Sequence, residues 1–305
     1  MYRKCYNSLD AAKLFMAICV VAIHTNPLYG CKNHLAVSIY TAIVSCAVPF
    51  FFICTGFLLG NRINQSNKDG CSAVKKSAVK MLKLYVIWSV IYLPPAIMDY
   101  INSGNSFLHN LAHYIKGFVI NGEHYNSWML WYLLSSFYAL VTVYFLLKHR
   151  LSVEKITVIG AVLLCGYFIL SAINDYSSLL PTEFTKVKRL IDISIGNGKP
   201  LQGFFYIPLI SAIVFISGFI VTVLLNQSLG RITLAITAAA LFCTVKGIEL
   251  SDSKVYFLMR KLSTGVYFIH LYAWMIVYYF MYGEKTYGLI PFLLTTALSV
   301  ILSAI

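Results

Sequence analysis

The stretch LDAAKLFMAICVVAIHTNP, residues 9–27, decides the fold of this chain. It is an apolar run long enough to cross a lipid bilayer, which takes about 20 residues at a rise of 1.5 Å each. The run nevertheless carries Asp10, Lys13 and His24. Ionisable groups inside lipid are costly, and by default they are functional candidates. The stretch therefore predicts a membrane-spanning helix with a functional polar face.

The composition of the whole chain agrees with a membrane protein. Of 305 residues, 59% are hydrophobic and 11% are charged, whereas an ordinary soluble domain has about 45–50% and about 25%. The apolar runs lack the alternation of a barrel strand, so only helices can satisfy their backbone in lipid. We expect an all-α, polytopic transmembrane helical bundle of about nine to ten spans, as a single domain over residues 1–305. Clear spans are expected near residues 9–29, 35–60, 82–101, 128–147, 156–174, 203–225, 231–248, 264–282 and 287–305.

Basic residues between the apolar runs predict the orientation. The net charge of +13 is concentrated there, which indicates contact with membrane lipid head groups and not with nucleic acid. The connections 62–83 and 148–155 are strongly basic, so both are placed in the cytoplasm, together with the N-terminus. We therefore expect a multi-pass protein of the cytoplasmic membrane. Nine spans would put Arg260 and Lys261 outside, against the same rule, and the topology after residue 248 stays open.

Three polar residues are predicted to share one face of the first helix. Lys13 and His24 differ by about 20° around the helix axis and are about 16 Å apart along it. Asp10 stands three residues before Lys13, so the two can form an ion pair. His24 lies in the outer half, and imidazole is the usual general base for a hydroxyl. The alternative is that Asp10 and Lys13 extend to water at the helix end, while His24 is a hydrogen-bonded packing residue.

Further candidates lie outside the first helix. His270 is also inside an apolar run, off the first helix, and it is either a site residue or a hydrogen-bonded core residue. Trp128 and Trp131 either form an aromatic wall of a binding site or belong to an interfacial aromatic belt. Pro94 and Pro95 predict a bend in the third span.

No metal site is expected from the histidines and cysteines. His109, His113 and His124 lie in an external segment, and an amphipathic surface segment is the better interpretation of their spacing than a metal site. The eight cysteines contain no CxxC pair and fall mostly in apolar runs, so they predict neither zinc nor disulfides.

Several motifs together resemble the acyltransferase-3 family of integral membrane acyltransferases. In its first helix, that family has a basic residue, usually Arg, followed after ten residues by an essential His; Lys13 and His24 fit this spacing. PFFFICTGFLLG, residues 49–60, is similar to the second helix, and in KMLKLYVIW Lys80 and Lys83 stand at two basic positions of the family. Later landmarks are WMLWYLL from Trp128, GNGKPLQGFF from Gly196, without the usual Arg before Asn197, and STGVYFIH, residues 263–270.

The resemblance implies transfer of an acyl group, acetyl in the first instance, from cytoplasmic acyl-coenzyme A to an acceptor hydroxyl at the outer face. Acceptors in the family include sugars of surface polysaccharide, peptidoglycan and other exported molecules. Lys13, Lys80 and Lys83 would then bind the polyanionic donor, and His24 would be the catalytic base. The residues expected to surround the acceptor are Asp10, Trp128, Trp131, Asn197 and His270.

A second interpretation belongs to a different functional class. A subset of the family forms the membrane half of membrane-bound serine racemases of vancomycin-resistant bacteria, in which a pyridoxal-phosphate domain follows the last helix. The helices would then bind or pass serine, and no acyl transfer would be needed. Another kind of transporter should show inverted internal repeats, which we do not find in the sequence. A soluble domain beyond residue 305 would favour the racemase interpretation.

Overall fold

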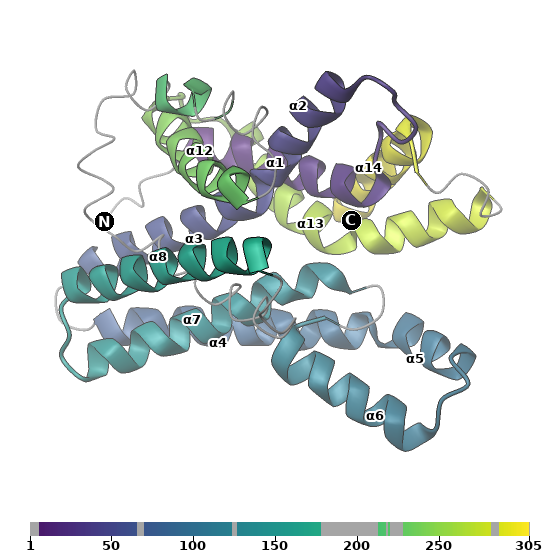
Figure 1. Cartoon of the computed structure of the whole chain (residues 1–305), viewed down its shortest axis with the longest axis horizontal. Coiled ribbons are helices and arrows are strands. Elements are labelled where there is room, and N and C mark those ends of the chain that lie inside the picture. Colours follow the sequence, from purple (N-terminus) through teal and green to yellow (C-terminus); the bar gives the residue numbers. More distant parts are fainter. Residues whose placement is uncertain are drawn as a thin grey trace. The chain divides into compact units, whose positions relative to one another are not determined.

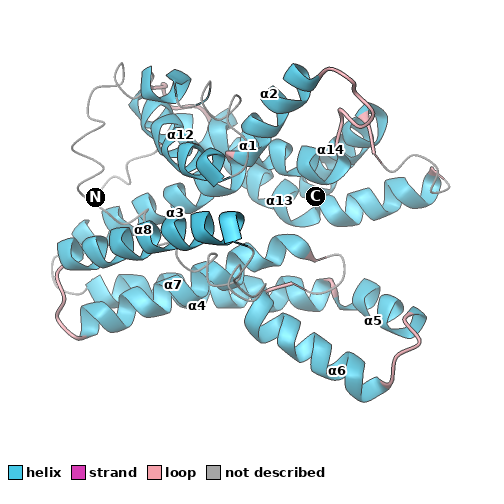
Figure 2. Ribbon diagram, in the orientation of Figure 1, coloured by secondary structure: helices cyan, strands magenta, loops and turns pink. Residues whose placement is uncertain are grey.

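The computed structural model describes residues 6–65, 70–123, 127–177, 213–217, 219, 228–281 and 287–304. These residues form helices joined by turns and loops, and no strand occurs among them (Figure 2). The all-α prediction is thereby confirmed. Two compact units make up the chain. The first unit comprises Met1–Cys54 with Pro200–Ile305, and the second comprises Thr55–Lys199.

The first unit is organised around its N-terminal helix, α1 (Asn7–Thr25). That helix contacts α2 (His34–Ser45), α12 (Ser228–Gly247), α13 (Lys254–Phe280) and α14 (Leu289–Ala304), which Figure 1 labels. Its apolar side chains form a core with those of α13, in which Leu9, Val21, Val266 and Leu271 are fully buried. The polar residues of α1 therefore lie within a packed group of helices.

The start of α13 is held beside the start of α1. The Asn7 side-chain nitrogen donates to the carbonyl oxygens of Leu250 and Ser251, each at 3.2 Å, and to Oδ1 of Asp252 at 2.8 Å. The Ser253 hydroxyl then caps α13 by accepting from the backbone nitrogen of Val255. The loop between α12 and α13 thus lies at the N-terminal end of α1.

As a result, α1 and α13 run parallel. Arg260, near the start of α13, bonds to Asp10, near the start of α1. Further along both helices, the rings of His24 and His270 stack. Two parallel membrane spans require an odd number of crossings between them, whereas the nine expected spans put an even number there. If both helices cross the membrane, Arg260 lies on the same side as the start of α1, and ten spans would give this parity; the topology after residue 248, which the sequence left open, stays a prediction.

Part of the expected set of spans is recovered. Among the described residues, three helical segments are long and apolar enough to cross a membrane, namely Asn7–Thr25, His34–Asn64 and Trp128–Lys148. The bent pair of α4 (Gly70–Ile91) and α5 (Leu93–Asn102) makes a fourth if it is one span. The bend of 48° falls just before Pro94 and Pro95 and confirms the predicted kink. Helices also cover the expected spans at α8, α12, α13 and α14. The total of about nine to ten stays a prediction, because the expected span 203–225 falls mostly outside the described residues.

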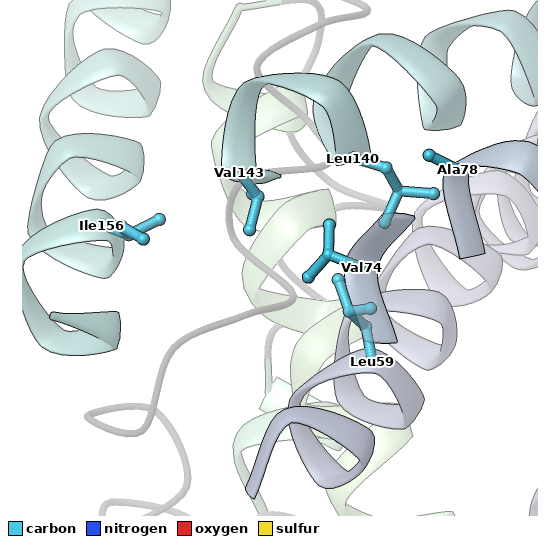
Figure 3. Packing of buried hydrophobic residues seen from close by; sticks show 6 residues of the cluster. All are labelled: Leu59, Val74, Ala78, Leu140, Val143 and Ile156. Atoms are coloured by element: carbon cyan, nitrogen blue, oxygen red, sulfur yellow. The ribbon is translucent and has the colours of Figure 1, made fainter. Parts of the chain in front are cut away.

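In the second unit, α4 packs against α7 (Trp131–Lys148), with α3 (Ala47–Gln65) and α8 (Val153–Ser177) alongside. Apolar side chains from these four helices meet in one cluster (Figure 3). On α4 and α7 the contributing residues are three or four positions apart, the spacing of a single helix face. The cluster consists of Leu59, Val74, Ala78, Leu140, Val143 and Ile156.

The segment before α7 is fixed by close backbone packing. After α6 (Phe107–Lys116) the chain forms a π-helix, Gly117–Asn121, in which the carbonyl of Phe118 accepts a 2.6 Å hydrogen bond from the Tyr85 hydroxyl. Gly122 has φ +71°, and a Cβ there would lie 2.7 Å from the Cα of Trp131. Only glycine suits both the positive φ and the lack of room for a Cβ. The close approach of Gly122 to Trp131 thus lies at the start of α7.

Candidate functional site

An ionic cluster joins the first turns of α1 to α13. Asp10 is buried, and its Oδ2 accepts from Nε of Arg260 at 2.9 Å and also from Nη2. The Lys13 ammonium lies 3.7 Å from Oδ1 of the same carboxylate, which confirms the predicted ion pair. One carboxylate thus holds two cations, so the cluster carries a net positive charge. The side chain of Arg260 is 40% exposed and that of Lys13 is 17% exposed, so both cations reach the surface of the unit.

A histidine pair occupies the other end of the same two helices. The imidazole rings of His24 and His270 stack with centroids 5.1 Å apart and planes inclined by 30°. His270 is fully buried, and Nδ1 of its ring lies 2.8 Å from the carbonyl oxygen of Tyr267. Phe51 meets the edge of the Tyr267 ring at 5.4 Å between centroids. The pair therefore lies among aromatic side chains and away from formal charges of the ionic cluster.

The turn that carries His24 is held on several sides. The Tyr40 hydroxyl on α2 donates to the carbonyl of Ala22 at 2.7 Å. The backbone nitrogen of Gly288, just before α14, donates to the carbonyl of Thr25 at 2.9 Å. Asn26 then ends α1 with φ +40°, the left-handed conformation that Asn tolerates better than most residues. These bonds occupy carbonyls at the end of α1 and fix the position of the His24 backbone.

The two groups are separated by matching lengths of helix. From Lys13 to His24 the rise along α1 is about 16 Å, and from Arg260 to His270 along α13 it is about 15 Å. Both helices therefore present a cation at one end and an imidazole at the other, in register. The predicted polar face of α1 is the face that packs against α13.

The remaining candidates lie in the second unit or outside the described residues. Lys80 and Lys83 are exposed one turn apart on α4. Trp128 is 42% exposed and begins a short 3-10 helix, Trp128–Leu130, and Trp131 begins α7. Asn197 is outside the described residues. The structure thus brings together Asp10, Lys13, His24 and His270, while the grouping of Lys13 with Lys80 and Lys83 stays a prediction.

The external segment with the expected surface histidines forms helix α6. Apolar residues at positions 107, 108, 111 and 115 and the polar His109 and His113 are all exposed, so α6 is an amphipathic surface helix, as predicted. His113 Nδ1 lies 3.4 Å from the Tyr100 hydroxyl. His124 is outside the described residues.

Arg260 is the site residue that sequence reasoning missed. It forms the shortest contacts of the ionic cluster, yet from the sequence it was only a charge whose side of the membrane stayed open. A signal was present, because Arg260 precedes His270 by nearly the interval that separates Lys13 from His24. Without knowing that α1 and α13 are parallel neighbours, this similarity of spacing could not be interpreted.

Comparisons with known proteins identify the family of the chain. A family profile described as an acyltransferase domain matches residues 6–305. Two relatives, both named amino-acid racemase and both from Enterococcus faecalis, are 32% identical over 143 residues and 30% identical over 159 residues. These alignments cover 47% and 52% of this chain but only 20% and 21% of the relatives, so the chain spans about a fifth of their length. No solved structure matches. The chain belongs to the acyltransferase-3 family of membrane acyltransferases.

Proposed function

We propose that this protein is an O-acyltransferase that moves an acyl group, acetyl in the first instance, from cytoplasmic acyl-coenzyme A to a hydroxyl at the outer face of the membrane. The observation that carries the proposal is the arrangement of α1 and α13, with cations at one end and two imidazoles at the other. The interval of about 16 Å suits a substrate whose anionic part and reactive thioester lie far apart. The expected acceptors are sugars of surface polysaccharide, peptidoglycan or another exported molecule.

The cations would hold the donor. Coenzyme A is polyanionic, and charge-assisted hydrogen bonds to phosphate are among the stronger polar contacts in proteins. Lys13 and Arg260 provide such donors at one end of the helix pair, with Asp10 fixing both side chains. Lys80 and Lys83 on α4 are proposed to complete the donor site from the second unit. The acyl group on its flexible arm would then extend toward His24.

His24 would remove the acceptor's proton during attack. The acceptor oxygen forms a bond to the thioester carbonyl carbon, the carbon–sulfur bond breaks, and coenzyme A leaves as a thiolate. The proton taken by His24 then neutralises that thiolate, so the ring returns to its starting state. General-base assistance of this kind typically contributes about 10²–10⁴ in rate. Trp128, Trp131 and Asn197 are proposed to bind the acceptor.

A second candidate function is favoured by the relatives. Both are named amino-acid racemases, so the helices of this chain could instead form a module that binds or passes an amino acid such as serine. In that case the histidine pair would bind the amino acid and no thioester would be cleaved. The two functions therefore differ in whether acyl-coenzyme A is consumed.

The test uses the purified full chain in lipid nanodiscs and in proteoliposomes. Release of free thiol from acetyl-coenzyme A is measured with and without peptidoglycan fragments or surface polysaccharide, and labelled serine uptake is measured in parallel. Acceptor-dependent thiol release with no serine uptake supports the transferase. Serine uptake without thiol release would reject it in favour of the binding module.

A further inference from the structure

The tautomer of His270 follows from its hydrogen bonds. Its Nδ1 lies 2.8 Å from the carbonyl oxygen of Tyr267 and 3.2 Å from that of Val266. Carbonyl oxygens can only accept, so Nδ1 must carry the hydrogen and donate it. In a neutral imidazole the second nitrogen, Nε2, is then left with a lone pair and can only accept. The backbone of α13 thus fixes His270 as an acceptor at Nε2.

This acceptor has no donor among the described residues. His270 is fully buried, and Nε2 makes no hydrogen bond to any part of the chain that the structure describes. Buried polar atoms in folded proteins are nearly always hydrogen-bonded, and exceptions call for an explanation such as a catalytic role. A small molecule that carries a donor would supply the missing partner.

Nε2 of His270 belongs to a ring that stacks on His24. The centroids of the two rings are only 5.1 Å apart. A molecule that donates to Nε2 of His270 therefore has its neighbouring atoms next to the His24 ring. Two donors on adjacent carbons of one molecule can reach two imidazoles arranged in this way, whereas an isolated hydroxyl can serve only one of them.

We propose that His270 positions the acceptor substrate by accepting a hydrogen bond at Nε2 from a donor adjacent to the hydroxyl that His24 deprotonates. The substrate class is accordingly a vicinal diol or a β-amino alcohol, which share a second donor on the neighbouring carbon. No proton moves at His270, because the hydrogen stays on its Nδ1, which donates it to the carbonyl oxygen of Tyr267. The expected preference among acceptors during turnover rests on the proposed transferase function. The expected hydrogen bond from the acceptor to Nε2 does not depend on acyl transfer.

The first experiment needs no turnover. Nitrogen-15 spectra of the histidine-labelled full chain, with the His270 signals identified by their loss in His270→Phe, should show a protonated Nδ1 and an unprotonated Nε2. Adding 1,2-propanediol or 1-amino-2-propanol should move the Nε2 signal, and the two probes distinguish a hydroxyl from an ammonium donor. An Nε2 that is already protonated, or that responds to neither probe, overturns the proposal whether or not the protein is a transferase.

The second experiment measures discrimination during turnover. The parent should acetylate 1,2-propanediol or 1-amino-2-propanol about tenfold better than 1-propanol in kcat/KM. His270→Phe keeps an aromatic ring but loses the acceptor nitrogen, so the preference should disappear while the KM for acetyl-coenzyme A stays unchanged. His270→Gln provides a side-chain oxygen acceptor and should restore part of the preference. An undiminished preference in His270→Phe contradicts the proposal, and absence of thiol release with all three alcohols counts against the transferase function alone.

Discussion

At one end of the α1–α13 pair the two helices meet through charges, and at the other end they meet through two imidazole rings. Asp10 binds Arg260 and Lys13, and the side chains of both cations stay partly exposed. His270, by contrast, is fully buried against His24. Charged side chains tolerate burial only when paired, whereas neutral imidazoles can be packed more deeply. Under the proposed function, one helix pair would therefore provide both the site for the polyanionic donor and the site for proton transfer.

The largest expected effect is at the imidazole end. Replacing His24 by Ala should lower acyl transfer by about 10²–10⁴ while the KM for the acyl donor stays close to the parent value, because a general base acts in the transition state. Initial rates of thiol release measure the loss, and the melting temperature in detergent checks folding.

His149→Ala is the matched control for that substitution, because His149 is an exposed histidine of the second unit. It should retain parental turnover. His270→Ala cannot serve as a control, although His270 also lies in an apolar run off the first helix, because its ring stacks on His24. If His24→Ala keeps most of its turnover, the chemical role of the imidazole end has to be abandoned.

The next largest effect is expected at the ionic end and concerns stability. Asp10→Asn removes the charge that holds two cations and leaves Lys13 and Arg260 beside each other. Breaking a buried ion pair from one side costs about 3–5 kcal/mol, and the partial exposure of Arg260 places this case near 3 kcal/mol. Denaturant unfolding in detergent measures the change in the free energy of unfolding.

Asp252→Asn is the control for the ionic end, since its Oδ1 can still accept the hydrogen bond from Asn7. It should unfold within about 0.5 kcal/mol of the parent. Equal stability of Asp10→Asn and Asp252→Asn would mean that the ionic cluster does not hold α1 to α13, and the contrast between the two ends would then be one of position only.

The sequence predicted the local half of this arrangement and missed the long-range half. Asp10 and Lys13 are three residues apart, so helix geometry alone predicts their ion pair, and α1 itself follows from apolar length. The partner of Asp10 stands 250 residues away, and no periodicity within one segment indicates such a pairing. Similarly, α4 begins at Gly70, well before the apolar run expected from residue 82, because hydropathy does not detect its basic first half, in which Ala, Lys and Met are the good helix formers.

A smaller effect is expected from the lysines of the second unit. If Lys80 and Lys83 contact the donor, each substitution by Ala loses a charge-assisted contact worth about 1.5–3 kcal/mol. Both side chains are exposed, so solvent screening places the effect at the lower limit, about a tenfold rise in the KM for acetyl-coenzyme A. Lys76→Ala, in the same exposed basic stretch of α4, should leave this KM unchanged. Should all three variants behave alike, the donor site would consist of the ionic cluster without α4.

The smallest perturbation tests whether the two ends lie on opposite sides of the membrane. Cys31 is exposed just after α1 and marks the imidazole end. Ser251→Cys marks the ionic end, because the backbone carbonyl of residue 251 accepts a hydrogen bond from the Asn7 side chain, which the substitution leaves in place. Each is studied alone, with Cys5 and Cys71 changed to Ser and a parallel chain lacking both markers as background. Since α1 and α13 are parallel, an impermeant thiol reagent should label Cys31 from outside and residue 251 only from the cytoplasm, with turnover unchanged. With nine spans, both cysteines would instead lie on the same side of the membrane. Labelling of both from outside would contradict the proposal that acyl transfer runs along α1 and α13 from one side of the membrane to the other.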